Sequence, residues 1–365
     1  MLYLDNASTT PILPSVKDEM LKYLTDYYGN ASSINNELGN ISKKAINKSR
    51  FYVAKLLDCQ LDEVIFTSCA TESNNLIIKG VVEANINFKT NRIITSSKEH
   101  PSILEICNYL KNKNISTTYL SVDEFHCICI NQLEDELKKG DVLLVSISWG
   151  TSERGTLNDI EKISDICNKY KVKFHTDATQ VVSKIPISLK KYNGITYLTA
   201  SGHKFHGPKG VGVAIIKKKG LPIIPLIHGG GQEFNLRSGT HSVHNIVGIG
   251  KACEVALIHF NKNKQNITEL ERFLKFILIK KYGKNIKFIN DVPHKIPGFL
   301  NVKINVNLLD DSKKNMTITS SKSACKERKL SITEQAKLKN DGFKVFRLVL
   351  HPYLSFDDIK NIELN

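Results

Sequence analysis

Short runs rich in β-branched and aromatic residues alternate with longer stretches of helical spacing between about residues 60 and 220. These runs are Glu63–Phe66, Arg92–Thr95, Val142–Ser146, Lys173–Thr176, Tyr197–Ala200 and Val211–Ile216. Strands that alternate with helices predict an α/β domain around a mostly parallel central sheet. Ligands of such domains bind at the carboxyl ends of the strands, so chemistry is expected in the residues that directly follow these runs.

The pattern changes after about residue 241. Helical spacing dominates to residue 282, and the strand candidates beyond it are short: Phe288–Ile289, Phe299–Val302 and Val345–Leu350. This predicts a second, smaller α+β domain. We assign residues 15–255 to a large domain, and residues 1–14 with 256–365 to the small domain. Two further segments, Leu2–Leu4 and Cys127–Ile130, have the alternation of strands.

The composition is that of a globular protein. With 365 residues, 41% of them hydrophobic, the chain can bury a large core. No apolar run approaches the roughly 20 residues that span a bilayer, and the sequence begins directly with a strand candidate. We therefore expect a cytoplasmic protein without a membrane partner.

The net charge of +15 is spread along the chain without a block of like charges. It predicts a solvated basic surface and no direct, specific nucleic-acid binding. Attraction to an acidic protein partner, or transiently to RNA, stays open because long-range fields raise encounter rates. The eight cysteines are scattered, which predicts reduced thiols. Cys127 and Cys129 lack a second pair at metal spacing, so we predict no structural metal.

Three groups of polar residues follow predicted strands directly. The segment Thr67–Asn75 places small polar residues at the start of a helix, which suits either a phosphate group or an ordinary helix cap. Asp177 ends another strand, where a buried carboxylate needs a cation such as a protonated pyridine nitrogen, or serves as a helix cap. In Ser201–Gly210, Lys204 lies in a glycine-flanked turn, and a lysine of lowered pKa condenses with an aldehyde to a Schiff base. Phosphate, pyridine nitrogen and aldehyde together describe pyridoxal 5'-phosphate (PLP), which we expect on Lys204.

Several motifs, in collinear order, resemble those of cysteine desulfurases of the NifS/IscS type, which are class V PLP enzymes. The motifs are YLDNASTTP (3–11), YGNASS (28–33), IFTSCATESNN (65–75), EHPSILE (99–105), HTDATQ (175–180), SGHKFHGPKGVG (201–212) and GGGQEFNLRSGT (229–240). The resemblance runs to about residue 255 and is weaker beyond it. It implies the PLP-dependent transferase fold type I, with a large domain around a mostly parallel sheet and a smaller α+β domain.

The resemblance also implies roles for single residues in binding PLP. Lys204 would hold the cofactor, Asp177 would pair with its pyridine nitrogen, and Gln180 would bond its phenolic oxygen. His100 would stack on the ring and take part in catalysis, and Ser152 would contact the ring oxygen. The phosphate would be met by Ala70, Thr71, Ser201 and His203 and, from the other subunit of a homodimer, by Thr240.

The nucleophile and the substrate contacts implied by the resemblance lie outside these groups. Ser320–Cys325 looks like the family's loop with the catalytic cysteine, and basic neighbours such as Lys322 would lower the pKa of the Cys325 thiol. Arg347 is similar to the arginine that holds the substrate carboxylate, although a structural ion pair is the other interpretation. Asn30, in YGNASS, would also contact the substrate, which the resemblance implies is L-cysteine.

The expected reaction converts L-cysteine to L-alanine and leaves a persulfide on Cys325. The sulfur would pass to an iron–sulfur scaffold or a tRNA-thiolation relay, and the sequence does not name the acceptor, exclude selenocysteine or show a need for an activator. Ser152 stands where the family has asparagine, Lys322 replaces a glycine, and the stretch from Cys325 to Arg347 is short. These departures keep two alternatives open: another class V lyase, epimerase or aminotransferase with a changed substrate, and a non-catalytic dimeric interaction protein.

Overall fold

The computed structural model describes residues 2–85, 91–305, 317–318, 342–360 and 362. The chain forms two compact units. The large unit comprises Pro11–Gly150 and Asn158–Ile258, and the small unit comprises Met1–Thr10, Thr151–Leu157 and His259–Asn365. Helix α7 (Val243–Tyr282) contributes residues to both units. The domain bounds expected from the sequence stay a prediction.

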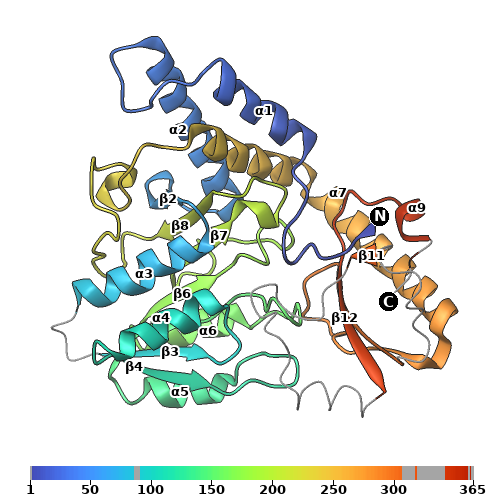
Figure 1. The fold of residues 1–365 in the computed structure, drawn as a ribbon. Coiled ribbons are helices and arrows are strands. Elements are labelled where there is room, and N and C mark those ends of the chain that lie inside the picture. The colour runs from blue at the N-terminus through green and yellow to red at the C-terminus, as the bar shows by residue number, and fades with distance from the viewer. Residues whose placement is uncertain (1, 86–90, 306–316, 319–341, 361, 363–365) are drawn as a thin grey trace. The chain divides into compact units, whose positions relative to one another are not determined.

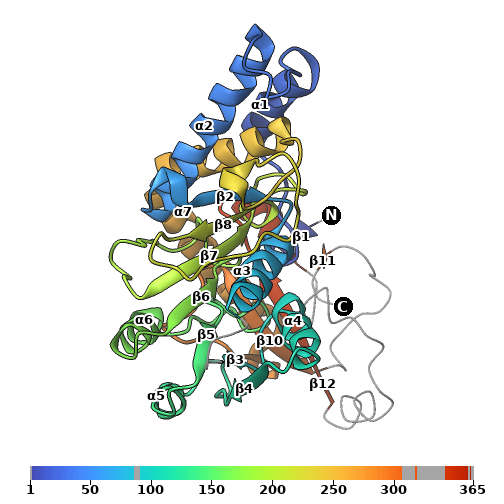
Figure 2. The same cartoon turned by 90° about the vertical axis from the view of Figure 1, so that its left-hand side faces the viewer.

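A seven-stranded sheet forms the centre of the large unit, in the order β2-β8-β7-β6-β5-β3-β4 (Figures 1 and 2). The strands are β2 (Val64–Thr67), β3 (Arg92–Ser96), β4 (Ser116–Leu120), β5 (Val142–Ser146), β6 (Lys173–Asp177), β7 (Ile195–Ser201) and β8 (Gly212–Ile216). Strand β8 runs antiparallel to both of its neighbours, and the other adjacent pairs are parallel. The carboxyl ends of β2, β3, β5, β6 and β7 therefore lie along one edge of the sheet.

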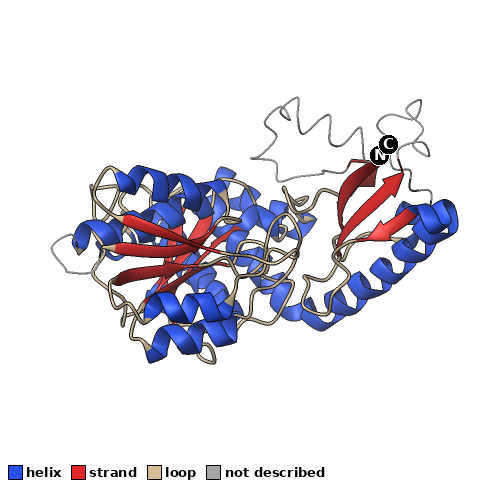
Figure 3. Cartoon of the chain, turned by 90° about the horizontal axis from the view of Figure 1, so that it is seen from below, coloured by secondary structure: helices blue, strands red, loops and turns tan. Residues whose placement is uncertain are grey.

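Helices cover both faces of this sheet (Figure 3). The helices of the large unit are α1 (Pro14–Thr25), α2 (Glu37–Leu57), α3 (Ala70–Ala84), α4 (Pro101–Lys111), α5 (Ile130–Leu137), α6 (Ile160–Lys169) and the first part of α7. All residues of β3 and β5 are buried, as expected for strands covered on both faces. This two-sided burial explains why these strands appear in the sequence as nearly continuous apolar runs.

Helix α6 shows how the local sequence builds one of these covering elements. Its buried residues, Ile160, Ile163, Ser164 and Cys167, recur at the spacing of one helix face. The side chain of Asp159 caps the helix by accepting a hydrogen bond from the Lys162 amide at 3.1 Å. The helix therefore packs its apolar face on the sheet and leaves its charged face in solvent.

The six strands predicted for the large domain are all present, with ends within about two residues of the prediction. The sequence did not predict β4, because its residues Ser116–Leu120 are largely polar and partly exposed at the sheet edge. The strand predicted at Cys127–Ile130 is wrong. Ile128 forms an isolated bridge with Val122, and Ile130 already begins α5, because the apolar spacing continues into a helix.

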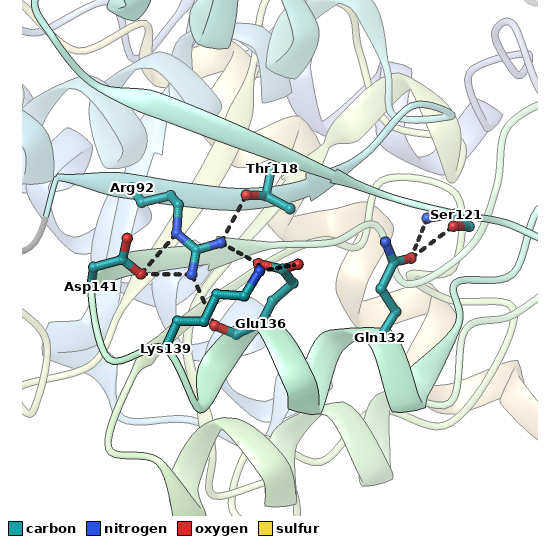
Figure 4. Close-up of polar contacts among 7 residues, drawn as sticks. All are labelled: Arg92, Thr118, Ser121, Gln132, Glu136, Lys139 and Asp141. Carbon is teal, nitrogen blue, oxygen red and sulfur yellow. Dashed lines mark hydrogen bonds and ion pairs between the residues drawn. The ribbon is translucent and has the colours of Figure 1, made fainter.

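A buried arginine links elements at the amino-terminal ends of the parallel strands (Figure 4). Arg92, at the start of β3, donates to Asp141 Oδ1 at 2.6 Å, to Glu136 Oε2 at 2.6 Å and to Thr118 Oγ1 at 2.8 Å. It also donates to the Glu136 carbonyl oxygen at the end of α5. These contacts join β3, β4, α5 and the start of β5 at the amino-terminal side, away from the edge that holds the polar motifs.

The small unit is built on a three-stranded antiparallel sheet in the order β12-β10-β9. Its elements are β9 (Ile286–Phe288), β10 (Phe299–Asn305), β12 (Phe343–Val349), the parallel pair β1 (Leu2–Tyr3) and β11 (Thr317–Ile318), and α9 (Phe356–Lys360). Leucines of α7, such as Leu270 and Leu274, pack with strand residues such as Leu300 and Leu348 in one core. The predicted α+β character of this region is confirmed. Among the helices of the described ranges, none is long and apolar enough to cross a membrane.

Candidate active site

Most residues singled out in the sequence lie where strands of the large unit end. They are Ala70 and Thr71 after β2, His100 after β3, Asp177 and Gln180 at and after β6, and Ser201, His203 and Lys204 at and after β7. Because these carboxyl ends share one edge of the sheet, the topology places the groups along that edge (Figure 1).

Asp177 is a buried carboxylate held in one orientation. Its Oδ1 accepts from the Thr179 amide at 2.9 Å, and its Oδ2 accepts from Asn74 Nδ2 at 3.1 Å. Gln180, in the turn that follows, is also buried. Burial lowers the pKa of the neighbouring His175 to about 4, although the charge of Asp177 acts to raise it. His175 is therefore neutral at pH 7, and no residue of the described ranges forms an ion pair with Asp177.

A chain of hydrogen bonds connects Asp177 to His100. Asn74 accepts from Thr199 Oγ1 at 2.7 Å and donates to Ser102 Oγ at 2.9 Å as well as to Asp177. The Ser102 hydroxyl lies 2.8 Å from His100 Nδ1, which also accepts from the Ser102 amide at 3.1 Å. Since Nδ1 accepts the amide hydrogen, the hydrogen-bond pattern assigns the ring proton of His100 to Nε2. The ring and the carboxylate are thus oriented by the same buried network.

The residue before His100 is a second buried carboxyl group. Glu99 is 1% exposed and accepts from Ser96 Oγ at 2.9 Å and from the Ser148 amide at 3.0 Å. Burial raises the pKa of Glu99 to about 7, more than its hydrogen bonds lower it. Glu99 therefore fastens the start of α4 to the residues that follow β5.

The start of α3 and the end of β7 together suit a phosphate group. Cys69 is the N-cap of α3 and makes no capping bond with its side chain, so the first amides, around Ala70 and Thr71, are oriented toward the helix end. The Ser201 hydroxyl is buried and has no hydrogen-bond partner in the described part of the chain. Burial, and then the charge of nearby lysines, lowers the pKa of His203 to about 4, so this ring is a neutral donor at pH 7.

Lys204 is half-buried in the short 3-10 turn η2 (Gly202–Lys204), where two close approaches require glycine. The Gly207 amide donates to the Gly202 carbonyl oxygen at 3.0 Å, and a Cβ on Gly207 would lie 2.9 Å from that oxygen. A Cβ on Gly212 would lie 2.6 Å from the carbonyl carbon of Cys69. These glycines let the turn that carries Lys204 and the start of α3 lie close together.

The motif 229–240 is anchored by Glu233. The two oxygens of this buried carboxylate accept from both terminal nitrogens of Arg50, at 2.7 and 2.9 Å. They also accept from the Phe66 amide at 2.7 Å and lie 2.7 Å from His241 Nε2. The loop is therefore tied by its own carboxylate to the end of β2, directly before the start of α3.

The same loop contains strained backbone and reaches the first turn of α3. Glu233, Phe234 and Asn235 have φ values of 48°, 58° and 66° in the left-handed region. Farther along, Arg237 Nε donates to Glu72 Oε1, in the first turn of α3, at 2.8 Å. Thr240, at the end of the motif, and Asn30 are both exposed on the single chain. The role predicted for Thr240 in a homodimer stays a prediction.

The remaining predicted residues belong to the small unit. Arg347, on β12, is 1% exposed and donates from Nη1 to the Ser152 carbonyl oxygen at 2.7 Å. Its Nη2 donates to Asp5 Oδ1 at 2.7 Å. The fold thus brings Ser152 and Arg347 together across the sequence. Cys325 and its neighbours lie outside the described residues, and the catalytic role of Cys325 stays a prediction.

Among the polar residues that received no role from the sequence are Asn74, Glu99 and Asp5, each with specific contacts. Each lies inside one of the quoted motifs, next to residues that did receive a role. Their signal was a polar side chain where neighbouring periodicity predicts burial, such as Asn74 on the buried face of α3. Their partners, however, are distant in sequence, so the motifs alone did not show what they contact.

The comparison with known families decides the identity of this arrangement. The model of the family "Aminotransferase class-V" matches residues 2–360, which is nearly the whole chain. The chain belongs to the class V aminotransferase family.

Among class V relatives, "Cysteine desulfurase IscS" of Dictyoglomus turgidum is 43% identical over 272 residues, which cover 74% of this chain and 68% of that protein. A solved structure of a "NifS-like protein" has a TM-score of 0.83 at 33% identity and covers 98% of this chain and 96% of its own. The structure of SspA in complex with cysteine has a TM-score of 0.82 at 28% identity and covers 97% of this chain and all of its own, 100%. The predicted fold class and the relation to the NifS/IscS type are confirmed.

Class V enzymes use PLP, and the residues present here fit it. The buried Ser201 hydroxyl, which has no hydrogen-bond partner among the described residues, is what an additional phosphate oxygen would satisfy. Asp177 is a buried carboxylate that forms no ion pair with any described residue, and a protonated pyridine nitrogen would compensate its charge. Lys204, in the turn η2 directly after β7, supplies an amine at the same edge of the sheet.

Proposed function

We propose that this protein is a PLP-dependent cysteine desulfurase that converts L-cysteine to L-alanine and leaves the sulfur as a persulfide on Cys325. The observation that supports it best is the buried, oriented Asp177, which has no ion-pair partner in the described ranges and lies at the same sheet edge as Ser201 and Lys204. The 43% identity to a cysteine desulfurase supports the choice of reaction within the class V family.

PLP would supply an electron sink for the substrate carbon that loses its proton. Asp177 would face the ring nitrogen, because its carboxylate is buried and, within the described ranges, its bonds from Thr179 and Asn74 bring no positive charge. Ser201, His203 and the amides at the start of α3 would hold the phosphate.

Protons would be moved by Lys204 and His100. The Lys204 amine would hold the cofactor and then carry the α-proton of the substrate. His100 is suited to donate from Nε2, because Ser102 occupies its Nδ1 in the present hydrogen-bond chain. The neutral His203, with its pKa near 4, would not compete as an acid at pH 7.

Sulfur transfer would take place at Cys325 while Arg347 holds the substrate carboxylate. A bond forms between the Cys325 thiolate and the substrate sulfur, and the bond between that sulfur and the substrate Cβ breaks. The Cβ takes up a proton and the α-carbon regains the proton that it lost, which completes L-alanine and leaves the persulfide. Lysines and the arginine near Cys325 in the sequence favour its thiolate.

The persulfide would pass to an acceptor protein, either an iron–sulfur scaffold or a tRNA-thiolation relay. The net charge of +15 favours an acidic acceptor, because opposite charge raises the rate of encounter. We further propose a homodimer in which Thr240 of each chain reaches the phosphate of the other, which accords with its exposure on the single chain.

The test is to mix the purified, PLP-loaded protein with L-cysteine and to measure alanine, sulfide and the mass of the Cys325 peptide. Cys325→Ser should keep the PLP absorbance and lose the persulfide, whereas Cys129→Ser, at an exposed thiol, should keep both. Full desulfurase activity in Cys325→Ser would refute the assignment. A wild-type protein that forms no alanine, but whose absorbance shifts with another amino acid, is a class V enzyme of another specificity.

A further inference from the structure

The buried guanidinium of Arg347 has a carboxylate partner close to the amino terminus. Asp5 Oδ1 lies 2.7 Å from Arg347 Nη2, and the two side chains are 14% and 2% exposed. Nη2 also donates to Ser8 Oγ at 3.2 Å, and Nη1 donates to the Ser152 carbonyl oxygen at 2.7 Å. All four residues belong to the small unit.

The backbone explains why Asp5 is found there. Asp5 forms a parallel bridge with Val349, two residues beyond Arg347 on β12. The Val349 amide donates to the Leu4 carbonyl oxygen at 2.6 Å, and Asn6 Nδ2 donates to the Val349 carbonyl oxygen at 2.6 Å. The segment around Asp5 is thus held against the strand that carries Arg347. Backbone hydrogen bonds therefore place the Asp5 carboxylate beside the guanidinium, in addition to the attraction between their charges.

Arg347 has three nitrogens, and within the described part of the chain its hydrogen bonds use only the two terminal ones. Nε is buried and has no hydrogen-bond partner among the described residues. A buried donor without an acceptor is unfavourable, so such a group calls for an explanation. Asp5, Ser8 and Ser152 meanwhile hold both terminal nitrogens, which prevents the guanidinium from turning to satisfy Nε elsewhere.

We propose that Asp5 is a positioning residue, which holds Arg347 in the orientation that reserves its Nε hydrogen for the carboxylate of the substrate. This rests on the proposed function, in which Arg347 binds that carboxylate. The pairing with Asp5 also compensates the buried charge before substrate arrives, so the arginine does not have to leave its position between turnovers. Asp5 then acts on substrate binding through Arg347 and touches neither the substrate nor the cofactor.

The test compares Asp5→Asn with wild type and with Asp291→Asn, a control in the small unit whose exposed carboxylate contacts the Lys275 side chain. We expect KM for L-cysteine to rise roughly tenfold in Asp5→Asn, the typical effect of one charge-assisted hydrogen bond, with kcat nearly unchanged. Asp291→Asn should leave both constants unchanged. Binding of L-alanine, followed by the absorbance of bound PLP, should weaken in parallel, whereas binding of cysteamine, which has no carboxylate, should not.

A double-mutant cycle separates this role from a general loss of stability. In an Arg347→Gln background, Asp5→Asn should cause no further weakening of L-alanine binding, because its effect passes through the arginine. Additive effects, equal weakening for cysteamine, or an unchanged or lower KM for L-cysteine would overturn the proposal. If the wild type forms no alanine from L-cysteine, the proposed function fails, and the cycle measured with L-alanine still decides the role of Asp5.

Discussion

Replacement of Glu233 by glutamine should strongly destabilise the large unit, because it removes the charge that compensates Arg50. The Glu233 side chain is 1% exposed and that of Arg50 is 9% exposed. The guanidinium carbon of Arg50 also lies 4.9 Å and 5.1 Å from the ring centres of Phe66 and Phe234, contacts that do not replace a carboxylate. Breaking one side of a buried pair typically costs about 3 to 5 kcal/mol.

The pKa of Glu233 leads to a similar magnitude. Burial acts to raise this pKa, but the bonds from His241 and Arg50 outweigh it and lower the pKa to about 2. Relative to an ordinary value of 4.5, this corresponds to about 3 kcal/mol of stability at neutral pH. Because the folded-state pKa is depressed, this stability is complete above about pH 4.5 and is lost as the pH falls toward about 2.

The measurement is urea unfolding followed by circular dichroism at pH 7, with Glu134→Gln as the control. Glu134 pairs with Lys169 on the surface, where water screens the two charges and the pair contributes little to stability. The difference between wild type and Glu233→Gln should shrink as the pH is lowered from about 4.5, since the wild-type carboxylate is then progressively protonated. A loss below about 1 kcal/mol at pH 7, no larger than that of the control, would refute the reasoning.

Two further substitutions test the buried network of the site. Burial raises the pKa of Glu99 to about 7, so its contribution to stability is full below about pH 4.5 and declines as the pH rises toward 7. Urea midpoints of Glu99→Gln, measured between about pH 4.5 and 7, should not show this decline. If the variant keeps the pH dependence of the wild type, the raised pKa of Glu99 is contradicted. Asn74→Ala should cost about 1 to 3 kcal/mol and weaken PLP binding, measured by absorbance, because Asp177 loses its bond at 3.1 Å. The control is Asn75→Ala, because the Asn75 side chain bonds only within α3 among the described contacts. Equal PLP affinity in the two variants would show that Asn74 does not orient Asp177.

Local sequence was sufficient for most elements and for the location of the chemistry. The strands of the large unit are short apolar runs, and burial on both faces makes such runs visible without any knowledge of the neighbours. The polar motifs directly after β2, β6 and β7 could be associated with one ligand, because parallel strands end at one edge of a sheet. Polar β4 escaped prediction, since an edge strand does not need a continuous apolar run.

The motifs also identified charged residues without showing which residues they pair with. Asp177 was recognised as a carboxylate in need of a cation, and Arg347 as a guanidinium that binds a carboxylate or forms a structural ion pair. The structure shows that Arg347 does form an ion pair, with Asp5, while its predicted contact with substrate stays a prediction. The role of Cys325 likewise depends on its sequence motif.

Only the tertiary structure showed which residues orient these groups. Asn74 bonds to Asp177 across 103 positions of sequence, Arg50 binds Glu233 across 183, and Arg347 binds Asp5 across 342. The periodicity of a segment determines which of its faces is buried, but it carries no information about which distant segment covers that face. Strand order and register decide that question, and they are set by the packing of the whole chain. The sequence therefore determined which chemistry this protein carries, and the fold determined which buried partners hold that chemistry in place.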